Sequence, residues 1–140
     1  MSDIAPASPA VPAMAACSVT TLAVHPGGAY SVLEVHAPAG AGVVPHRHER
    51  EDLTLLLVEG AATVTSGDRS AALVPGVPLG LPRGRPHAVA AGEDGARLLV
   101  VCAPAGLESV LQAVADPGVD ADDRAALLAG HGVHAVGGRW

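Results

Sequence analysis

Residues 40–60 read GAGVVPHRHEREDLTLLLVEG, a glycine-containing loop that leads into an apolar strand. His46 and His48 are separated by one residue, so on an extended backbone both side chains leave from the same face, because the side-chain period of a strand is two. Two imidazoles that converge on one point are the beginning of a metal site.

A third histidine follows a second turn. Residues 76–87 read GVPLGLPRGRPH, in which Pro82 and Gly84 favour a tight turn and His87 begins the next strand. A small β-barrel with two such turn-plus-histidine units can place three ligands around one ion in its mouth. The two stretches together predict a metal site made of His46, His48 and His87.

Short apolar segments separated by Gly- and Pro-containing turns make up most of the chain and predict an all-β barrel or sandwich. The expected strands are residues 19–24, 30–37, 53–58, 62–65, 70–73, 78–81, 87–90 and 96–102. The run 53–58 is apolar enough for a strand covered on both faces, and Glu59-Gly60 is expected to end it.

The pattern changes to a helical period near the C-terminus. Leu107, Val110, Leu111 and Val114 predict an amphipathic helix over residues 106–115, lying on the outside of the barrel. A second helix is expected over residues 121–129, entered at Asp120 and closed by Gly130 or Gly132. We therefore divide the chain into a flexible arm (1–16), a barrel (17–104) and a helical tail packed on the barrel (105–140).

Composition narrows the classes of function. The 140 residues suit one domain, and the absence of Phe with one Tyr and one Trp makes an aliphatic core. A net charge of −6 without any Lys leaves no basic stripe, so we expect no nucleic-acid partner. Prolines 6, 9 and 12 interrupt any apolar N-terminal run, so we expect no signal peptide or membrane span. Two cysteines, Cys17 and Cys102, are too few for a disulfide framework, and we expect a cytoplasmic protein.

The two histidine stretches resemble the cupins, whose motifs are G-x5-H-x-H-x(3 or 4)-E-x6-G and G-x5-P-x-G-x2-H-x3-N. Gly40, His46, His48 and Gly60 match the first motif, and Gly76, Pro82, Gly84 and His87 match the second. The resemblance covers residues 21–111 and is closest to small single-domain cupins of the quercetin-dioxygenase-like kind. It implies a single-domain jelly-roll barrel, to which the helical periodicity adds short C-terminal helices.

Two positions depart from that pattern. The family's metal-binding Glu falls on Leu53, and its closing Asn falls on Ala91. Neighbouring Glu51 and Asp52 do not replace the Glu automatically, since a shift of one residue moves a side chain to the opposite face of a strand. A bulge that turns Asp52 inward is an alternative to Leu53 as an apolar wall.

Other polar residues have two interpretations each. Glu34 and His36 share a face of the strand at 30–37 and serve either as a general base or partner of the site, or as an outward polar face. Tyr30 either donates a hydrogen bond to a ligand or packs half-exposed beside a Gly-Gly turn. His131 and His134 lie in the tail, where we expect them at the surface.

The resemblance implies a metal-dependent enzyme with one divalent ion, most simply Fe, with Zn, Ni, Mn and Cu as alternatives. We expect a dioxygenase that acts on a small enolisable or phenolic substrate in the barrel cavity. A non-redox cyclase, isomerase or decarboxylase of natural-product biosynthesis, and a metal-free ligand-binding protein, are the alternatives. Exposed barrel edges and an apolar outer face lead us to expect a homodimer.

Overall fold

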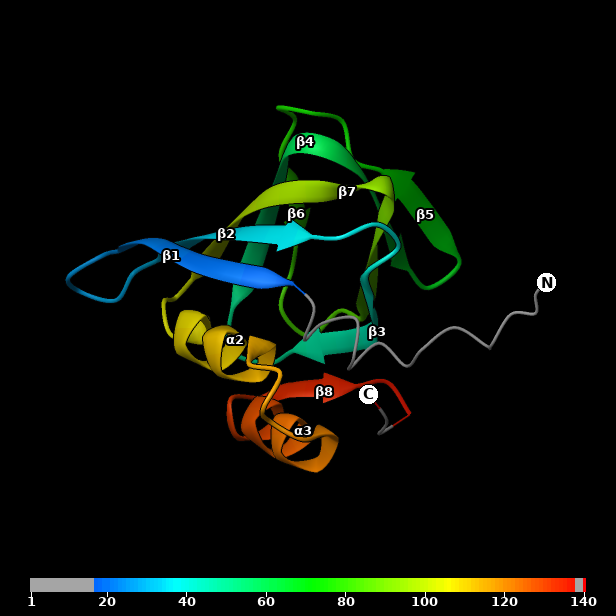
Figure 1. Cartoon of the computed structure of the whole chain (residues 1–140). Helices are drawn as coiled ribbons and strands as arrows, with labels where there is room; N and C mark the ends of the chain where they lie inside the picture. Colours follow the sequence, from blue (N-terminus) through cyan, green and yellow to red (C-terminus); the bar gives the residue numbers. More distant parts are fainter. Residues whose placement is uncertain (1–16, 138–139) are drawn as a thin grey trace.

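Two long strands run through the whole molecule. In the computed structural model, which describes residues 17–137 and 140, β4 (Asp52–Ser66) and β7 (His87–Ala103) pair antiparallel from Asp52 opposite Ala103 to Thr65 opposite Ala88 (Figure 1). The predicted arm at residues 1–16 lies outside the described residues. Four of the other described strands pair directly with one of these two.

Each long strand joins two segments that the sequence analysis expected to be separate. The prediction that Glu59-Gly60 ends a strand is wrong, because β4 continues through Gly60 with register shifts on both sides of it. Gly60 has φ of 82°, and a Cβ at this position would collide with the backbone carbonyl of Gly95 on β7. Glycine therefore forms a bulge that bends the ladder here and does not break it.

The remaining strands attach to the two halves of this ladder and build the predicted all-β barrel. The second half of β7 pairs with β2, which pairs with β1, and the first half pairs with β3, which pairs with β8. The other edge of β4 pairs with β5 and β6. The bounds are β1 Ser18–Val24, β2 Ser31–Ala37, β3 Gly42–His48, β5 Arg69–Ala72, β6 Leu79–Leu81 and β8 Val133–Ala135. The C-terminal strand β8 was not predicted.

Both expected helices are present near the C-terminal end. In α2 (Leu107–Ala115), Leu107 and Val114 are buried, and Gln112 Nε2 donates a hydrogen bond of 2.9 Å to Thr21 Oγ1 of β1. In α3 (Ala121–Gly130), Asp120 caps the first turn by accepting from the backbone N–H of Asp123 at 2.9 Å. Neither helix within the described part of the chain is long and apolar enough to cross a membrane.

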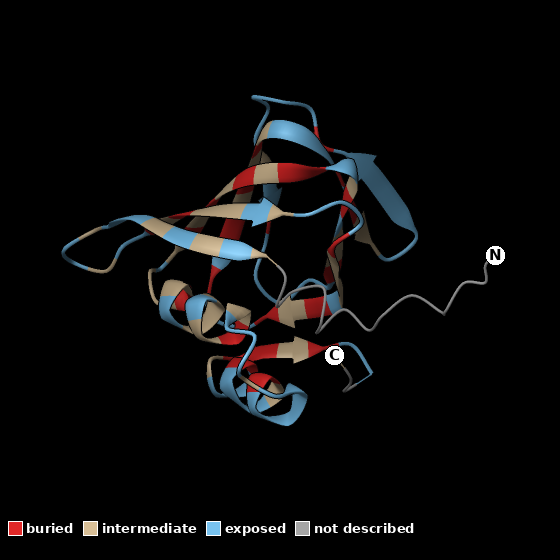
Figure 2. Ribbon diagram, viewed as in Figure 1, coloured by how far each residue is buried: buried red, intermediate tan, exposed pale blue. Residues whose placement is uncertain are grey.

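The apolar core lies inside the barrel. Along β4, Leu53, Leu55 and Leu57 are buried, and the residues between them are half-buried. Figure 2 shows the same alternation along β4 and β7, with exposed residues on the outward side of the helices. The sequence analysis expected both faces of residues 53–58 to be buried. The outer face is only half-buried, while the inner face is apolar and buried.

Candidate metal centre

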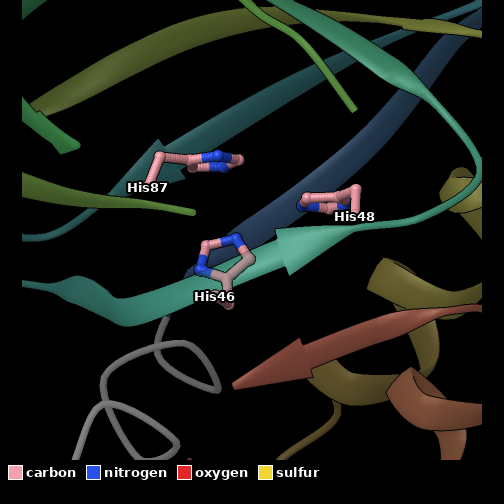
Figure 3. A group of neighbouring side chains, drawn as sticks. All are labelled: His46, His48 and His87. Carbon is pink, nitrogen blue, oxygen red and sulfur yellow. The ribbon is translucent and has the colours of Figure 1, made fainter. Parts of the chain in front are cut away.

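Three histidines from two neighbouring strands meet inside the barrel. His46 and His48 lie on β3, and His87 begins β7 directly opposite His46 in the register of the two strands. All three are buried, and their ligand nitrogens lie within 4.8 Å of one another (Figure 3). The structure thus brings together the three residues that the sequence analysis put forward as metal ligands.

Two local features of the backbone position the strand ends that carry the histidines. The β3–β7 register shifts between Val43 and His46, at a point where Pro45 has no N–H to offer to the ladder. The second turn is tied to β3 by a 2.6 Å hydrogen bond from the backbone N–H of Gly84 to the carbonyl of His48. These two features fix the strand ends that carry the rings.

Hydrogen bonds select the ring nitrogen that faces the cavity. His46 Nδ1 donates to the carbonyl of Val44 at 2.8 Å, and His48 Nδ1 donates to Glu51 Oε1 at 2.9 Å. A neutral imidazole carries one N–H, so these bonds leave Nε2 of both rings with a free lone pair. His87 Nδ1 is buried and forms no well-aligned hydrogen bond among the described residues, although the backbone of Arg85 is close enough to act on the ring and raise its pKa in part.

Burial keeps two of the rings neutral. Desolvation and the neighbouring His87 lower the pKa of His46 to about 3, and desolvation and the neighbouring His48 lower the pKa of His87 to about 4. Neutral imidazole is the form that binds a divalent ion. The Nε2 lone pairs of His46 and His48 and the neutral state of His46 and His87 fit a metal ion held by three imidazoles, with coordination positions left open.

The histidines face a small apolar cavity of about 140 Å³. Its walls are aliphatic side chains of β2, β4 and β7, among them Val35, Leu55 and Leu98. Apart from the three imidazoles, the polar side-chain groups that line it are the thiol of Cys17 and the indole of Trp140, whose ring centroid lies 5.4 Å from that of His46. In residues 17–137 and 140, no carboxylate, guanidinium or phenol lines this cavity.

Position 53 is an apolar wall. Leu53 is buried and lines the cavity, as one of the two sequence-based interpretations expected. The alternative, in which a bulge turns Asp52 inward, is wrong. Asp52 is exposed, and its carboxylate accepts from the backbone N–H of Arg83 at 2.9 Å and from the Arg83 guanidinium at 3.2 Å. These bonds hold the pKa of Asp52 below its usual range.

The structure does not bring Glu34, His36 or Tyr30 to the histidines. Leu33 and Val35 point inward on β2, so Glu34 and His36 take the outer face, because side chains alternate along a strand. Glu34 accepts from Arg97 Nε at 2.8 Å and from His36 at 3.2 Å, and bonds from His36 and Arg97 lower its pKa. Tyr30 is 41% exposed and packs beside His25. Of their two interpretations, the structure has the outward one.

Sequence reasoning missed a buried carboxylate and its partner. Glu51 is 1% exposed, and its two oxygens accept from His48 Nδ1 and His131 Nε2, both at 2.9 Å. Burial raises the pKa of Glu51, but the bonds from His48 and His131 outweigh it, so the pKa is lowered overall. The surface placement expected for His131 is wrong, whereas His134 lies nearer the surface beside Glu49. The available signal was the three-residue spacing from His48 to Glu51.

Comparisons with known proteins agree with this fold. The model of the cupin domain matches residues 33–102. The structure of KdgF from Halomonas sp. has a TM-score of 0.62 and 23% identity, covering 67% of this chain and 85% of that chain. The TT1209 protein from Thermus thermophilus has a TM-score of 0.53 and 30% identity, covering 61% and 83%.

A third similar structure carries an activity in its description. A sugar phosphate isomerase of the cupin superfamily from Silicibacter pomeroyi has a TM-score of 0.56 and 25% identity, covering 66% of this chain and 62% of that chain. No curated protein matches the chain significantly.

Proposed function

The chain belongs to the cupin family, and we propose that it is a metal-dependent dioxygenase for a small, largely apolar substrate with an enol or phenol oxygen. The observation that carries this proposal is the pairing of three buried imidazoles with an apolar cavity that has no carboxylate, guanidinium or phenol among its described lining residues. Such a cavity could bind a metal ion and enclose an apolar substrate, and its described lining offers no carboxylate for acid–base catalysis.

His46, His48 and His87 would hold one divalent ion through ring nitrogens. Imidazole ligands suit Fe, Cu, Ni and Zn, and iron is our first choice because it exchanges electrons with O2. When bound, the ion supplies a positive site for an oxygen anion of the substrate and a route for electrons to O2. With Leu53 in place of a carboxylate, no ligand at that position offsets the charge of the ion, which favours an anionic oxygen on the substrate.

The aliphatic walls set the size and polarity of the substrate. A cavity of about 140 Å³ is close to the ~150 Å³ that holds one benzene molecule. We therefore expect a substrate of about one ring, such as a catechol or a cyclic diketone in its enol form. In carbon–carbon cleavage of an enol by O2, both oxygen atoms enter the products, so no separate reductant is needed.

The same walls weigh against proton-transfer chemistry. A non-redox isomerase, cyclase or decarboxylase needs a group that accepts and returns a proton within hydrogen-bond reach of the substrate. Glu34 and His36 lie on the outer face, and the cavity lining offers no carboxylate in the part of the chain that the structure describes. A sugar phosphate, which the Silicibacter pomeroyi protein is described as isomerising, would find no cationic partner in these walls.

The test combines metal analysis with oxygen uptake. Protein purified anaerobically should contain about one equivalent of iron, and His46→Ala and His87→Ala should lose it. The iron-loaded protein should consume O2 with single-ring catechols or diketones and place both atoms of ¹⁸O2 in the products, with a three-ring flavonol as the oversized control.

Each other outcome selects another function. Iron-loaded protein that consumes no O2 with any of these compounds contradicts the dioxygenase. Zinc or nickel as the native metal, with turnover that needs no O2, would favour the cyclase, isomerase or decarboxylase. Wild-type protein that binds no metal would favour a ligand-binding cupin.

The assembly and compartment are also proposals. Among the described strands, β1 pairs only with β2 and exposes Leu22 and Val24, which supports a homodimer through this edge. Light scattering of wild type and Leu22→Glu tests it, since a dimer should dissociate in the variant. With only two cysteines, we propose a reducing compartment, the cytoplasm.

A further inference from the structure

The loop between β3 and β4 carries its one fully buried carboxylate on Glu51. Both oxygens of this carboxylate are engaged, Oε1 with His48 Nδ1 and Oε2 with His131 Nε2, each at 2.9 Å. A carboxylate accepts hydrogen bonds and does not donate them, so both ring nitrogens carry the proton. The geometry therefore places a negative group directly behind one candidate metal ligand.

Three consecutive residues of this loop, 49–51, each form a hydrogen bond with residues at the C-terminal end of α3. The backbone N–H of Glu49 donates to the carbonyl of Gly132 at 2.9 Å, and Arg50 Nη2 donates to the carbonyl of Gly130 at 3.2 Å. The third bond joins His131 to Glu51. Since β8 then pairs with β3 itself, the tail is bound both to the loop and to the strand that carries His46 and His48.

We propose that Glu51, held in place by His131, is the positioning residue of this centre: it fixes His48 as the Nδ1–H tautomer with Nε2 turned to the ion, and supplies the negative charge that Leu53 does not. The proposal rests on the metal-binding part of the proposed function and is independent of its oxygen chemistry. A hydrogen bond from the remote ring nitrogen to a carboxylate fixes the orientation of a metal-bound histidine and raises its basicity.

Glu51 acts through His48 and is not itself a ligand. Both of its oxygens accept hydrogen bonds from ring N–H groups. Among the described residues, the group of side chains that could hold a metal ion consists of the three histidines and does not include Glu51. His46 has the uncharged carbonyl of Val44 in the corresponding position. Of these two rings, therefore, the one backed by a carboxylate is His48.

The first measurement is the tautomer of His48 in metal-free protein, read from ¹⁵N–¹H correlation spectra of the imidazole rings. We expect Nδ1–H in the wild type, a weaker preference in Glu51→Gln, whose single amide oxygen can accept from only one of the two rings, and loss of that preference in Glu51→Ala. His131→Ala should weaken the preference, because the carboxylate then loses the bond that fixes its second oxygen.

The second measurement is the affinity for Co²⁺, obtained by competition with a chelator. We expect Glu51→Gln to weaken binding about 10-fold through loss of charge, and Glu51→Ala up to about 100-fold through loss of both charge and orientation. The neighbouring exposed pair supplies matched controls, since the side chains of Glu49 and His134 are joined in the same way at 3.2 Å, whereas the ring hydrogen bonds of His46 and His48 go to Val44 and Glu51. Glu49→Gln and His134→Ala should stay within about twofold.

Two results would overturn the inference: an Nε2–H tautomer of His48 in metal-free wild type, or unchanged Co²⁺ affinity in both Glu51 variants. If Glu51→Ala does not fold, Glu51→Gln still decides whether the charge matters. Wild-type protein that binds no Co²⁺ would overturn the proposed function, and the tautomer measurement would then decide the role of Glu51 by itself.

Discussion

Leu53 of β4 lies directly opposite Leu81 of β6, and both side chains are buried in the wall of the cavity that holds the three histidines. Position 53 is where the cupin motif places its carboxylate ligand. Here the position is filled by one member of an apolar cross-strand pair, so among the described residues the candidate metal site consists of imidazoles alone.

Leu53→Glu tests whether position 53 still faces the metal. In metal-free protein the buried carboxylate should lower the free energy of unfolding by about 3 kcal/mol, because it loses water without gaining a partner. With Co²⁺ present we expect affinity at least about 10-fold above wild type, since a fourth ligand joins the ion. Urea unfolding and chelator competition measure the two effects.

Leu55→Glu is the matched control, because Leu55 is the next inward residue of β4 and lines the same cavity. It should destabilise the protein similarly without any gain in Co²⁺ affinity. Equal gains in both variants would mean that any carboxylate in the cavity reaches the ion, and position 53 would then have no special geometry.

Acid should destabilise the metal-free protein through His46 and His87. Their pKa values are lower in the folded protein, about 3 and about 4, than the ordinary 6.5, so the unfolded chain binds more protons below pH 6.5. The free energy of unfolding should therefore fall as pH drops from 6.5 towards 4, by up to about 1.4 kcal/mol per pH unit for each histidine.

Urea unfolding at several pH values in the presence of a chelator measures this slope. In the double variant His46→Gln, His87→Gln the slope between pH 6.5 and 4 should be much smaller, while above pH 7 neither ring contributes. A double variant with the wild-type slope would show that other groups carry the acid sensitivity.

Trp140 should report on metal binding through its fluorescence. It is the only tryptophan of the chain, and its ring centroid lies 5.4 Å from that of His46. Cu²⁺ bound by the histidines should quench most of the tryptophan fluorescence, with saturation near one equivalent, whereas Zn²⁺, with a filled d shell, should not. His46→Ala should abolish the saturable quenching, and quenching that persists there would place the copper elsewhere.

Asp52 should be dispensable for metal binding despite its place beside Glu51. Its carboxylate faces Arg83 at the surface, so Asp52→Ala should change Co²⁺ affinity by less than about twofold, in contrast to Glu51→Ala. A loss in Asp52→Ala as large as in Glu51→Ala would mean that the Arg83 turn, and not the carboxylate at position 51, holds His48.

The sequence allowed prediction of the features that depend on local spacing. His46 and His48 had to share a face of a strand, and the turn at Pro82 and Gly84 had to precede a strand that begins with His87. Both helices and the Asp120 cap follow from the same kind of local pattern. These features need no knowledge of which strands become neighbours.

Features that depend on distant neighbours were not predictable in this way. Glu51 and His131 are 80 positions apart, and nothing in either local pattern shows that α3 ends beside the β3–β4 loop. Gly60 resembles a strand break in the sequence because its close approach to Gly95 of β7 becomes visible only in the paired strands. Glu34 and His36 were correctly placed on one face, but the choice of the inner face depended on the packing of Leu33 and Val35.

The size of the cavity gives the last prediction, which concerns substrate choice. Leu98 is buried, lines the cavity and lies opposite Leu57 and Val35 in the β4 and β2 ladders. Leu98→Ala should cost about 2–4 kcal/mol of unfolding free energy, because the deleted methyl groups leave a void in a closed wall. It should also shift ligand preference from one-ring to two-ring compounds, measured by displacement of a fluorescent probe.

Leu57→Ala is the control, because Leu57 does not line the cavity and the variant should cost a similar free energy without altering that preference. A wild-type protein that already prefers two-ring ligands would contradict the size limit drawn from the cavity, and with it the single-ring substrate.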